Sequence, residues 1–350
     1  MELFGVIKIF FLTAISFLVA VSWTPFLTDF LYRYRLGKKI RDEISTPIFS
    51  RLHRSKAGTP TMGGLLIWVT VLGLALFFFL GERWFGGPFF SGFNFLSRSQ
   101  TLLPLGVLVA SALVGLIDDY FNVRGIGPHG GGLKMRHRLL IYTVIAAIGA
   151  LWFYFKLDWD LLRVPFVGNF NIGWWYVPAF ILVIVATSFS VNETDGLDGL
   201  SGGVLLSSFA TFGAIAFLQG RTDLAALCGV IVGALSAFLW FNINPARFFM
   251  GDTGAMSLGV TLGVVAMLTN SALLLPIIGF VFVLESASVI LQILSKRFRG
   301  KKIFRSSPIH HHLEAIGWPE PKIVMRFLII AGVTSVVGLM LAAVDFGFFS

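Results

Sequence analysis

Ten long apolar stretches divide this chain, and each is long enough to cross a lipid bilayer. A membrane-spanning helix needs about 20 mostly apolar residues, and only helices or closed barrels can satisfy their backbone polar groups inside lipid. Only 13% of the 350 residues are Asp, Glu, Lys or Arg, against about 25% in soluble domains. The sequence therefore predicts an all-α polytopic integral membrane protein with a single membrane-embedded domain over residues 1–350. The expected spans are residues 5–24, 64–81, 102–117, 139–156, 175–191, 204–220, 224–241, 255–270, 272–294 and 325–344.

The first span, residues 5–24, has some features of a signal peptide. It carries one basic residue, Lys8, has no cleavage site between small residues, and ends at Trp23-Thr24-Pro25, so we expect it to be retained as a span. Two connecting segments should lie at the membrane surface. Residues 82–101, rich in Phe, Gly and Trp, are predicted to lie in the interface, and residues 157–173 to form a short hairpin.

Basic residues orient the chain, because cytoplasmic loops carry an excess of Lys and Arg. Of the 27 Lys and Arg residues, 21 fall in loops on one side of the predicted spans. That side is therefore predicted to be cytoplasmic, with both termini outside. The net charge of +9 favours anionic lipid or phosphate partners and does not indicate nucleic acid. The 21 residues are Arg33, Arg35, Lys38, Lys39, Arg41, Arg51, Arg54, Lys56, Arg124, Lys134, Arg136, Arg138, Arg247, Lys296, Arg297, Arg299, Lys301, Lys302, Arg305, Lys322 and Arg326.

Residues 192–203 combine three carboxylates with four glycines between two apolar runs. Carboxylates at a membrane edge are costly and commonly mark an ion or substrate site, and the glycines allow a ligand to approach the backbone. Asp195 and Asp198 share one face if a helix begins here. A solvated loop is the alternative that this stretch alone leaves open.

Two further acidic motifs lie on the same predicted side. Asp118 and Asp119 end the third span, and because adjacent carboxylates repel, one should bind a cation or hold a proton, which suits a metal ligand beside a general base. Asp252 lies where the eighth span begins. It can serve as an N-cap or as a ligand of Mg²⁺, which takes one or two carboxylates plus phosphate oxygens.

Basic and amide side chains accompany these acids. Lys56, before the run Gly58–Gly64, can hold a phosphate as a point charge, although a single interfacial lysine more commonly extends its side chain to the membrane surface. Lys134 can contact a phosphate, whereas Arg136 and Arg138 beside it are interpreted as membrane anchors. Asn242 begins the segment that leads to Asp252.

Three consecutive histidines, His310–His312, lie in the last loop. Consecutive residues on one helix do not converge on one ion, so a zinc cage would need ligands from elsewhere, and hydrogen bonds to phosphates or substrate fit better. Glu285 lies inside the ninth predicted span and faces a cavity or a neighbouring helix. Acidic clusters, basic residues and histidines at one membrane face, with Cys228 as the single cysteine, indicate a magnesium site for phosphoryl chemistry.

These motifs, in their order along the chain, resemble the polyprenyl-phosphate N-acetylhexosamine-1-phosphate transferase superfamily. The histidine tract makes the chain most similar to its phospho-N-acetylmuramoyl-pentapeptide-transferase branch. Residues 125–138 depart from the short family sequence through a Gly-Gly-Gly run. The matching segments are Lys56–Gly64, Asp118–Asp119, Asn192–Gly203, Asn242–Ala255 and Pro308–Glu314.

The resemblance implies a reaction in which undecaprenyl phosphate attacks the β-phosphate of UDP-MurNAc-pentapeptide, giving lipid I and UMP with Mg²⁺ as cofactor. It implies that Asp252 binds the metal, with Asp195 as a second ligand, and that Asp118 or Asp119 is the base. It also implies a homodimer in the bacterial inner membrane. Direct displacement and a two-step route through an aspartyl-phosphate both stay open. The resemblance also counts His310 among the catalytic residues, beside Asp118, Asp119 and Asp252. The remaining residues, which the resemblance places at substrate or phosphate, are Lys56, Lys134, Asn192, Asp198, Asn242, His311 and His312.

Two alternatives stay open. The first keeps the enzyme class but changes the donor to UDP-N-acetylglucosamine. The second is a transporter, for which ionisable residues are expected near the middle of the membrane. Here most acids lie at span ends, and only Glu285 is central.

Overall fold

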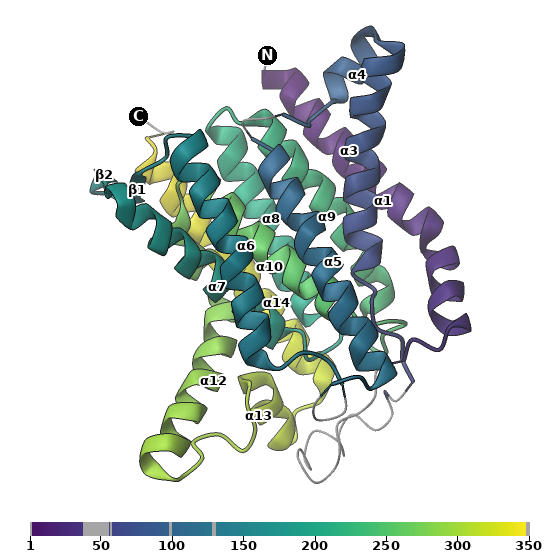
Figure 1. Ribbon diagram of the computed structural model, residues 1–350, viewed down its shortest axis with the longest axis vertical. Helices are drawn as coiled ribbons and strands as arrows, with labels where there is room; N and C mark the ends of the chain where they lie inside the picture. Colours follow the sequence, from purple (N-terminus) through teal and green to yellow (C-terminus); the bar gives the residue numbers. More distant parts are fainter. Residues whose placement is uncertain (1, 38–55, 57, 98–99, 128–130, 348–350) are drawn as a thin grey trace.

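The computed structural model describes residues 2–37, 56, 58–97, 100–127 and 131–347. Its described part is a bundle of long helices with one small hairpin (Figure 1). Five basic residues used above for orientation (Lys38, Lys39, Arg41, Arg51 and Arg54) lie outside the described residues. The elements are α1 Glu2–Arg33, α3 Leu65–Phe85, α4 Gly87–Phe93, α5 Leu102–Arg124, α6 Met135–Lys156, β1 Leu161–Val164, β2 Gly168–Asn171, η3 Gly173–Trp175, α7 Tyr176–Thr194, α8 Leu200–Leu218, α9 Thr222–Asn242, α10 Gly251–Leu268, η4 Ala272–Leu274, α11 Leu275–Ile278, α12 Phe280–Arg299, α13 Ile309–Ala315 and α14 Glu320–Asp345.

The expected all-α polytopic class is confirmed. Within the described residues nine helices are long and apolar enough to cross a membrane, and the bent pair of residues 272–278 and 280–299 makes a tenth crossing if it is counted as one span. The predicted hairpin is present, with β1 antiparallel to β2. The beginning of α1, the end of α14 and the hairpin lie at one end of the bundle, and α13 lies at the opposite end (Figure 1). We call the end that carries α13 the site end.

Helix α10 is the central element of the bundle. It packs against α5 and α7, and each of its residues is buried except Asp252, which is half-buried. Its inner neighbours approach closely because glycines line the contacts. At Gly115 of α5, a Cβ atom would overlap the Asp252 carbonyl and lie 2.7 Å from the Thr253 Cα. The beginning of α10 is therefore placed by backbone-to-backbone contact with α5.

Replacing Gly115 with Ala is expected to destabilise the protein by about 3 kcal/mol, because forced overpacking against a rigid backbone costs about 1–3 kcal/mol or more. Gly106 on the same helix is the matched control, since a Cβ there meets nothing within 4 Å and alanine favours a helix over glycine. Thermal unfolding of the two variants in detergent measures the difference. Equal unfolding temperatures for the two would contradict the close approach.

The ninth predicted span, residues 272–294, is wrong as a straight helix. The chain bends by 85° between residues 272–278 and 280–299, and Gly279 at the break has a non-helical conformation. Sharp breaks in helices occur at Pro and Gly, and Pro276 precedes Gly279 here. Beyond the break, α12 carries a polar stripe of Glu285, Ser288, Gln292 and Ser295, which follow one another at three- and four-residue spacing and are all buried, while the opposite face is apolar and exposed. Helix α12 therefore extends away from the bundle with α13 beside it (Figure 1).

Two predicted boundaries also change. Helix α1 continues past Trp23-Thr24-Pro25 to Arg33 with Pro25 inside it. A proline is tolerated within a membrane-spanning helix when neighbouring groups or local backbone adjustments satisfy the freed carbonyl. Helix α5 continues past residue 117 to Arg124. The Asp118–Asp119 pair therefore lies within the last two turns of a helix.

Candidate functional site

Two carboxylates share one guanidinium at the site end of the bundle. Arg138, in the first turn of α6, places its Nη2 atom 2.7 Å from Asp118 Oδ2 and 2.7 Å from Asp252 Oδ2. The Asn192 amide donates to Asp252 Oδ1 at 2.6 Å, and its oxygen accepts from Arg138 Nη1 at 3.3 Å. These four side chains, which we call the arginine cluster, come from α5, α6, α7 and α10 and are largely buried.

The glycine run before α6 explains how Asp118 is held. Gly131 and Gly132 both have positive φ, a conformation that favours glycine, and the turn they form presents the Leu133 N–H to Asp118 Oδ1 at 2.5 Å. The glycine run, which departs from the short family sequence, thus positions Asp118.

Asp119 points away from the arginine cluster and holds the N-terminus of α10. Its Oδ1 accepts the Asp252 N–H and its Oδ2 accepts the Thr253 N–H, both at 3.0 Å. Gly251 has φ +73°, and a Cβ there would lie 2.5 Å from Asp119 Oδ2, so the Gly-Asp-Thr sequence fits this contact. A carboxylate is favourable at the positive end of a helix. Asp252 is then not an N-cap, and its own carboxylate faces the arginine cluster.

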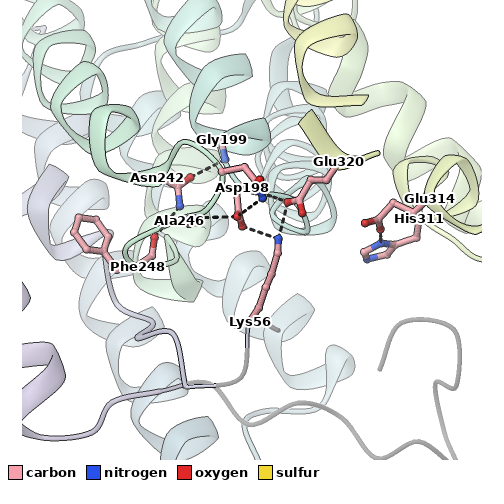
Figure 2. A network of polar contacts seen from close by, with 10 residues as sticks. Lys56, Asp198, Gly199, Asn242, Ala246, Phe248, His311, Glu314 and Glu320 are labelled. Atoms are coloured by element: carbon pink, nitrogen blue, oxygen red, sulfur yellow. Dashed lines mark hydrogen bonds and ion pairs between the residues drawn. The ribbon is translucent and has the colours of Figure 1, made fainter. Parts of the chain in front are cut away.

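Lys56 lies between two carboxylates (Figure 2). Its Nζ atom is 2.7 Å from Asp198 Oδ1 and 2.5 Å from Glu320 Oε1. The Asp198 N–H also donates to Glu320 Oε1, at 2.7 Å. We call Lys56, Asp198 and Glu320 the lysine cluster. It joins the loop before α3, the turn before α8 and the first residue of α14.

Side-chain amides and a backbone N–H group hold Asp198 of the lysine cluster and the loops beside it. Asp198 Oδ2 accepts from Asn244 Nδ2 at 2.9 Å and from the Ala246 N–H at 3.1 Å. Asn242 is buried: its oxygen accepts the Gly199 N–H at 2.8 Å, and its nitrogen donates to the Phe248 carbonyl at 2.7 Å. Because both of its polar atoms bind backbone groups, Asn242 fixes two loops relative to each other.

The three consecutive histidines have three different partners. His310 is fully buried, with Nδ1 2.9 Å from Glu285 Oε2, and a Cβ on Gly196 would overlap its Nε2 atom. His311 Nδ1 is 2.7 Å from Glu314 Oε2, and Figure 2 shows that pair to one side of the lysine cluster. His312 Nδ1 accepts the Arg305 N–H at 3.2 Å. The polar face of α12 thus meets α13 through the pair that Glu285 makes with His310.

The remaining predicted residues are placed differently. Asp195 is half-buried and ends α7, its N–H bonding to the Asn192 carbonyl at 3.3 Å. Lys134 is exposed at the beginning of α6. Across the part of the chain that the structure describes, no three His, Cys, Asp or Glu side chains converge as a metal cage. The structure therefore does not bring Asp195 and Asp252 together in such a group.

The arginine cluster nevertheless fits a hard divalent cation. Asp118 and Asp252 direct one oxygen each at a single positive group, and the Asn192 oxygen is beside it. Carboxylate and amide oxygens are ligands that Mg²⁺ accepts, with water or phosphate oxygens completing its octahedron. In the structure the guanidinium of Arg138 supplies the compensating charge at that position.

Sequence reasoning missed Arg138 and Glu320 and gave Glu285 no specific role. Arg138 was interpreted as a membrane anchor, yet it is three residues into a helix whose first turn lies beside buried acids. The helical spacing could have indicated its role. Lys134 and Arg138 are one helical turn apart, and Arg138, which lies further into the helix, reaches the acids. The sequence around Glu320 could also have indicated a fixed position. Glu320 lies between Pro319 and Pro321 at the start of a helix, and prolines there restrict the backbone conformation.

Comparisons with known proteins place this chain among related sequences. The model of glycosyl transferase family 4 matches residues 101–270, and signature 1 of the phospho-N-acetylmuramoyl-pentapeptide-transferases matches residues 56–67. Curated proteins with that transferase name are similar over nearly the whole chain. The protein of Chloroflexus aggregans is 38% identical over 95% of this chain and 89% of its own length. The proteins of Listeria welshimeri and Geobacillus thermodenitrificans are 37% and 36% identical over 90% and 93% of this chain, and 92% and 95% of their own lengths.

Proposed function

This chain belongs to the phospho-N-acetylmuramoyl-pentapeptide-transferase family, and on that premise we propose that it transfers phospho-MurNAc-pentapeptide from UDP-MurNAc-pentapeptide to undecaprenyl phosphate. The products are lipid I, an intermediate of peptidoglycan synthesis, and UMP. The observation that carries the proposal is the 38% identity over 95% of the chain. The convergence of α5, α6, α7 and α10 on the arginine cluster at one end of an apolar bundle supports it. A homodimer in the bacterial inner membrane, with the site end cytoplasmic, is part of the same proposal.

The placement of the polar side chains suits the two substrates. A water-soluble nucleotide and a lipid-anchored phosphate meet only at a membrane surface, and holding them together replaces a bimolecular encounter with an effectively intramolecular one. Overall, an oxygen of the lipid phosphate bonds to the β-phosphorus of the donor, the bond from that phosphorus to the oxygen of UMP breaks, and UMP leaves. Arg138 and Lys56 supply positive charge close to where phosphates would lie.

The adjacent acids have different roles in this proposal. Both oxygens of Asp119 hold backbone N–H groups of α10, so proton transfer to Asp119 would disrupt the helix start. Asp118 uses Oδ1 for the Leu133 N–H and directs Oδ2 to the Arg138 guanidinium beside Asp252. We therefore assign to Asp118 the removal of the proton from the lipid phosphate.

Magnesium is proposed as the cofactor. Asp252 would hold it, with Asp118 and Asn192 as neighbouring oxygen donors and Asp195 as a further candidate ligand from the adjacent turn. When bound, Mg²⁺ would neutralise the pyrophosphate charge and stabilise the leaving oxygen. Asp252 is the least buried residue of α10, with 13% of its side chain exposed, which supports its assignment as the ligand.

The test is UMP release by the purified protein with each donor, in the presence of undecaprenyl phosphate. We expect release from UDP-MurNAc-pentapeptide with Mg²⁺ and none after chelation with EDTA. Release from UDP-N-acetylglucosamine alone would move the chain to the sister branch of the superfamily. Accumulation of a solute in sealed vesicles, with neither donor cleaved, would indicate transport.

A further inference from the structure

Glu320 joins the last helix to both the loop before α3 and the turn before α8. It is the first residue of α14, between Pro319 and Pro321. A single oxygen, Oε1, accepts the Lys56 ammonium at 2.5 Å and the Asp198 N–H at 2.7 Å. The side chains of Glu320 and Lys56 are only 12% and 17% exposed. Contacts of this kind between charged groups shielded from water are stronger than surface ion pairs.

Asp198 does not depend on Lys56 for its own position. Its Oδ2 atom is held by Asn244 and by the Ala246 N–H, which leaves Oδ1 for Lys56. Without Lys56, Asp198 would therefore keep its hydrogen bonds to Asn244 and to the Ala246 N–H. The Lys56 ammonium lies between the two carboxylates and 5.9 Å from the centre of the Phe249 ring, and Figure 2 shows its long side chain extending between the carboxylates.

We propose that Glu320 is a positioning residue of the donor-binding site, which holds the Lys56 ammonium and the Asp198 backbone in fixed relation. The inference rests on the function proposed above, in which Lys56 and Asp198 lie at the nucleotide donor. A flexible lysine side chain contributes more to binding affinity when it loses less conformational entropy on binding. With one anion on each side, the ammonium is already ordered before the donor arrives. Glu320 thus acts through Lys56 and does not contact the reacting atoms.

The decisive variant is Glu320→Gln, which keeps the size of the side chain and the acceptor for the Asp198 N–H but removes the charge that holds Lys56. Because a charge-assisted contact of the Lys56 ammonium is lost, we expect the KM for the UDP-linked donor to rise about tenfold. The kcat should stay within about threefold of wild type, because no reacting atom is touched. Glu320→Ala removes both contacts and should raise the donor KM further.

A double-mutant cycle tests whether Glu320 acts on donor binding through Lys56. If Glu320 acts through Lys56, then Glu320→Gln should change the Kd of UMP, measured by calorimetry, by less than about twofold in a Lys56→Met background. Lys322→Gln is the matched control on the same helix, because Lys322 contacts Trp318 and lies outside both clusters. It should leave the donor KM unchanged.

Three results would overturn the inference: a donor KM unchanged in Glu320→Gln, a loss confined to kcat, or a full additional effect on UMP binding in the Lys56→Met background. All three presuppose that the wild-type protein releases UMP. Failure of the wild-type protein to cleave either donor would instead reject the proposed function, so the two failures are distinguishable.

Discussion

Asp252→Asn is expected to lower the rate of UMP release about 1000-fold or more while the helix bundle stays folded. Asp252 is the least buried residue of α10, with 13% of its side chain exposed, and its two oxygens contact Asn192 and Arg138. Asparagine has the same size, so packing is retained, but the negative charge that would hold Mg²⁺ is lost. A 1000-fold loss corresponds to about 4 kcal/mol of transition-state stabilisation.

The matched control for this variant is Asp223→Asn. Asp223 also pairs with a buried cation, Lys8, at 2.9 Å, but at the end of the bundle opposite to the site. It should cost some thermal stability and leave turnover within about threefold. Turnover of Asp252→Asn within tenfold of wild type, with wild-type unfolding temperature, would contradict the assignment of Asp252 to the reaction.

Arg138→Met is expected to lower turnover by about 100-fold and to destabilise the protein by about 3–5 kcal/mol. Removing one partner of a buried ion pair leaves its counter-charge uncompensated, which costs that amount in other proteins. Here two carboxylates, Asp118 and Asp252, would face each other without the guanidinium. Methionine keeps most of the apolar side-chain volume, so the loss reports the charge. Thermal unfolding and UMP release measure the two effects.

Added Mg²⁺ should raise the unfolding temperature of Arg138→Met more than that of the wild-type protein, because the divalent cation would replace the missing charge between the two acids. Arg136→Met is the control. Arg136 is exposed two residues earlier on α6 and should behave as wild type. Similar losses in both variants would show that the basic segment acts only as a membrane anchor. The same shift with Mg²⁺ in wild type and Arg138→Met would argue against a cation site at the arginine cluster.

The sequence predicts the bundle well and the contacts within the site only in part. Hydropathy predicts the apolar helices and the pattern of residues 157–173 predicts the hairpin, because both are local properties. It fails at α12, where an apolar average hides a polar stripe that only helical spacing reveals. The gathering of acids and histidines at one end also follows from topology, since helix ends on the same side of a membrane lie together.

Partners within the site do not follow from spacing. Asp118 and Asp119 are neighbours in sequence, but they point about a third of a helical turn apart, so one meets Arg138 and the other meets the beginning of α10. Lys134 and Arg138 look equivalent as basic residues, and only the packing of α6 against α5 and α7 decides which one reaches the acids. Glu320 meets Lys56 across 264 positions of the chain, a distance that no local pattern encodes.

The contact between Asp119 and α10 has a consequence for how the protein is made. Helices α6, α7, α8 and α9 are synthesised between α5 and α10, so α5 must enter the membrane before the backbone groups that satisfy Asp119 exist. Until α10 docks, Asp119 lacks the two backbone N–H groups that it accepts in the finished bundle, which is unfavourable in a medium of low polarity. The arrival of α10 supplies those groups and brings Asp252 to Asp118 and Arg138 in the same step. Docking of α10 and assembly of the arginine cluster are thus one event, and a chain truncated before α10 would lack that cluster.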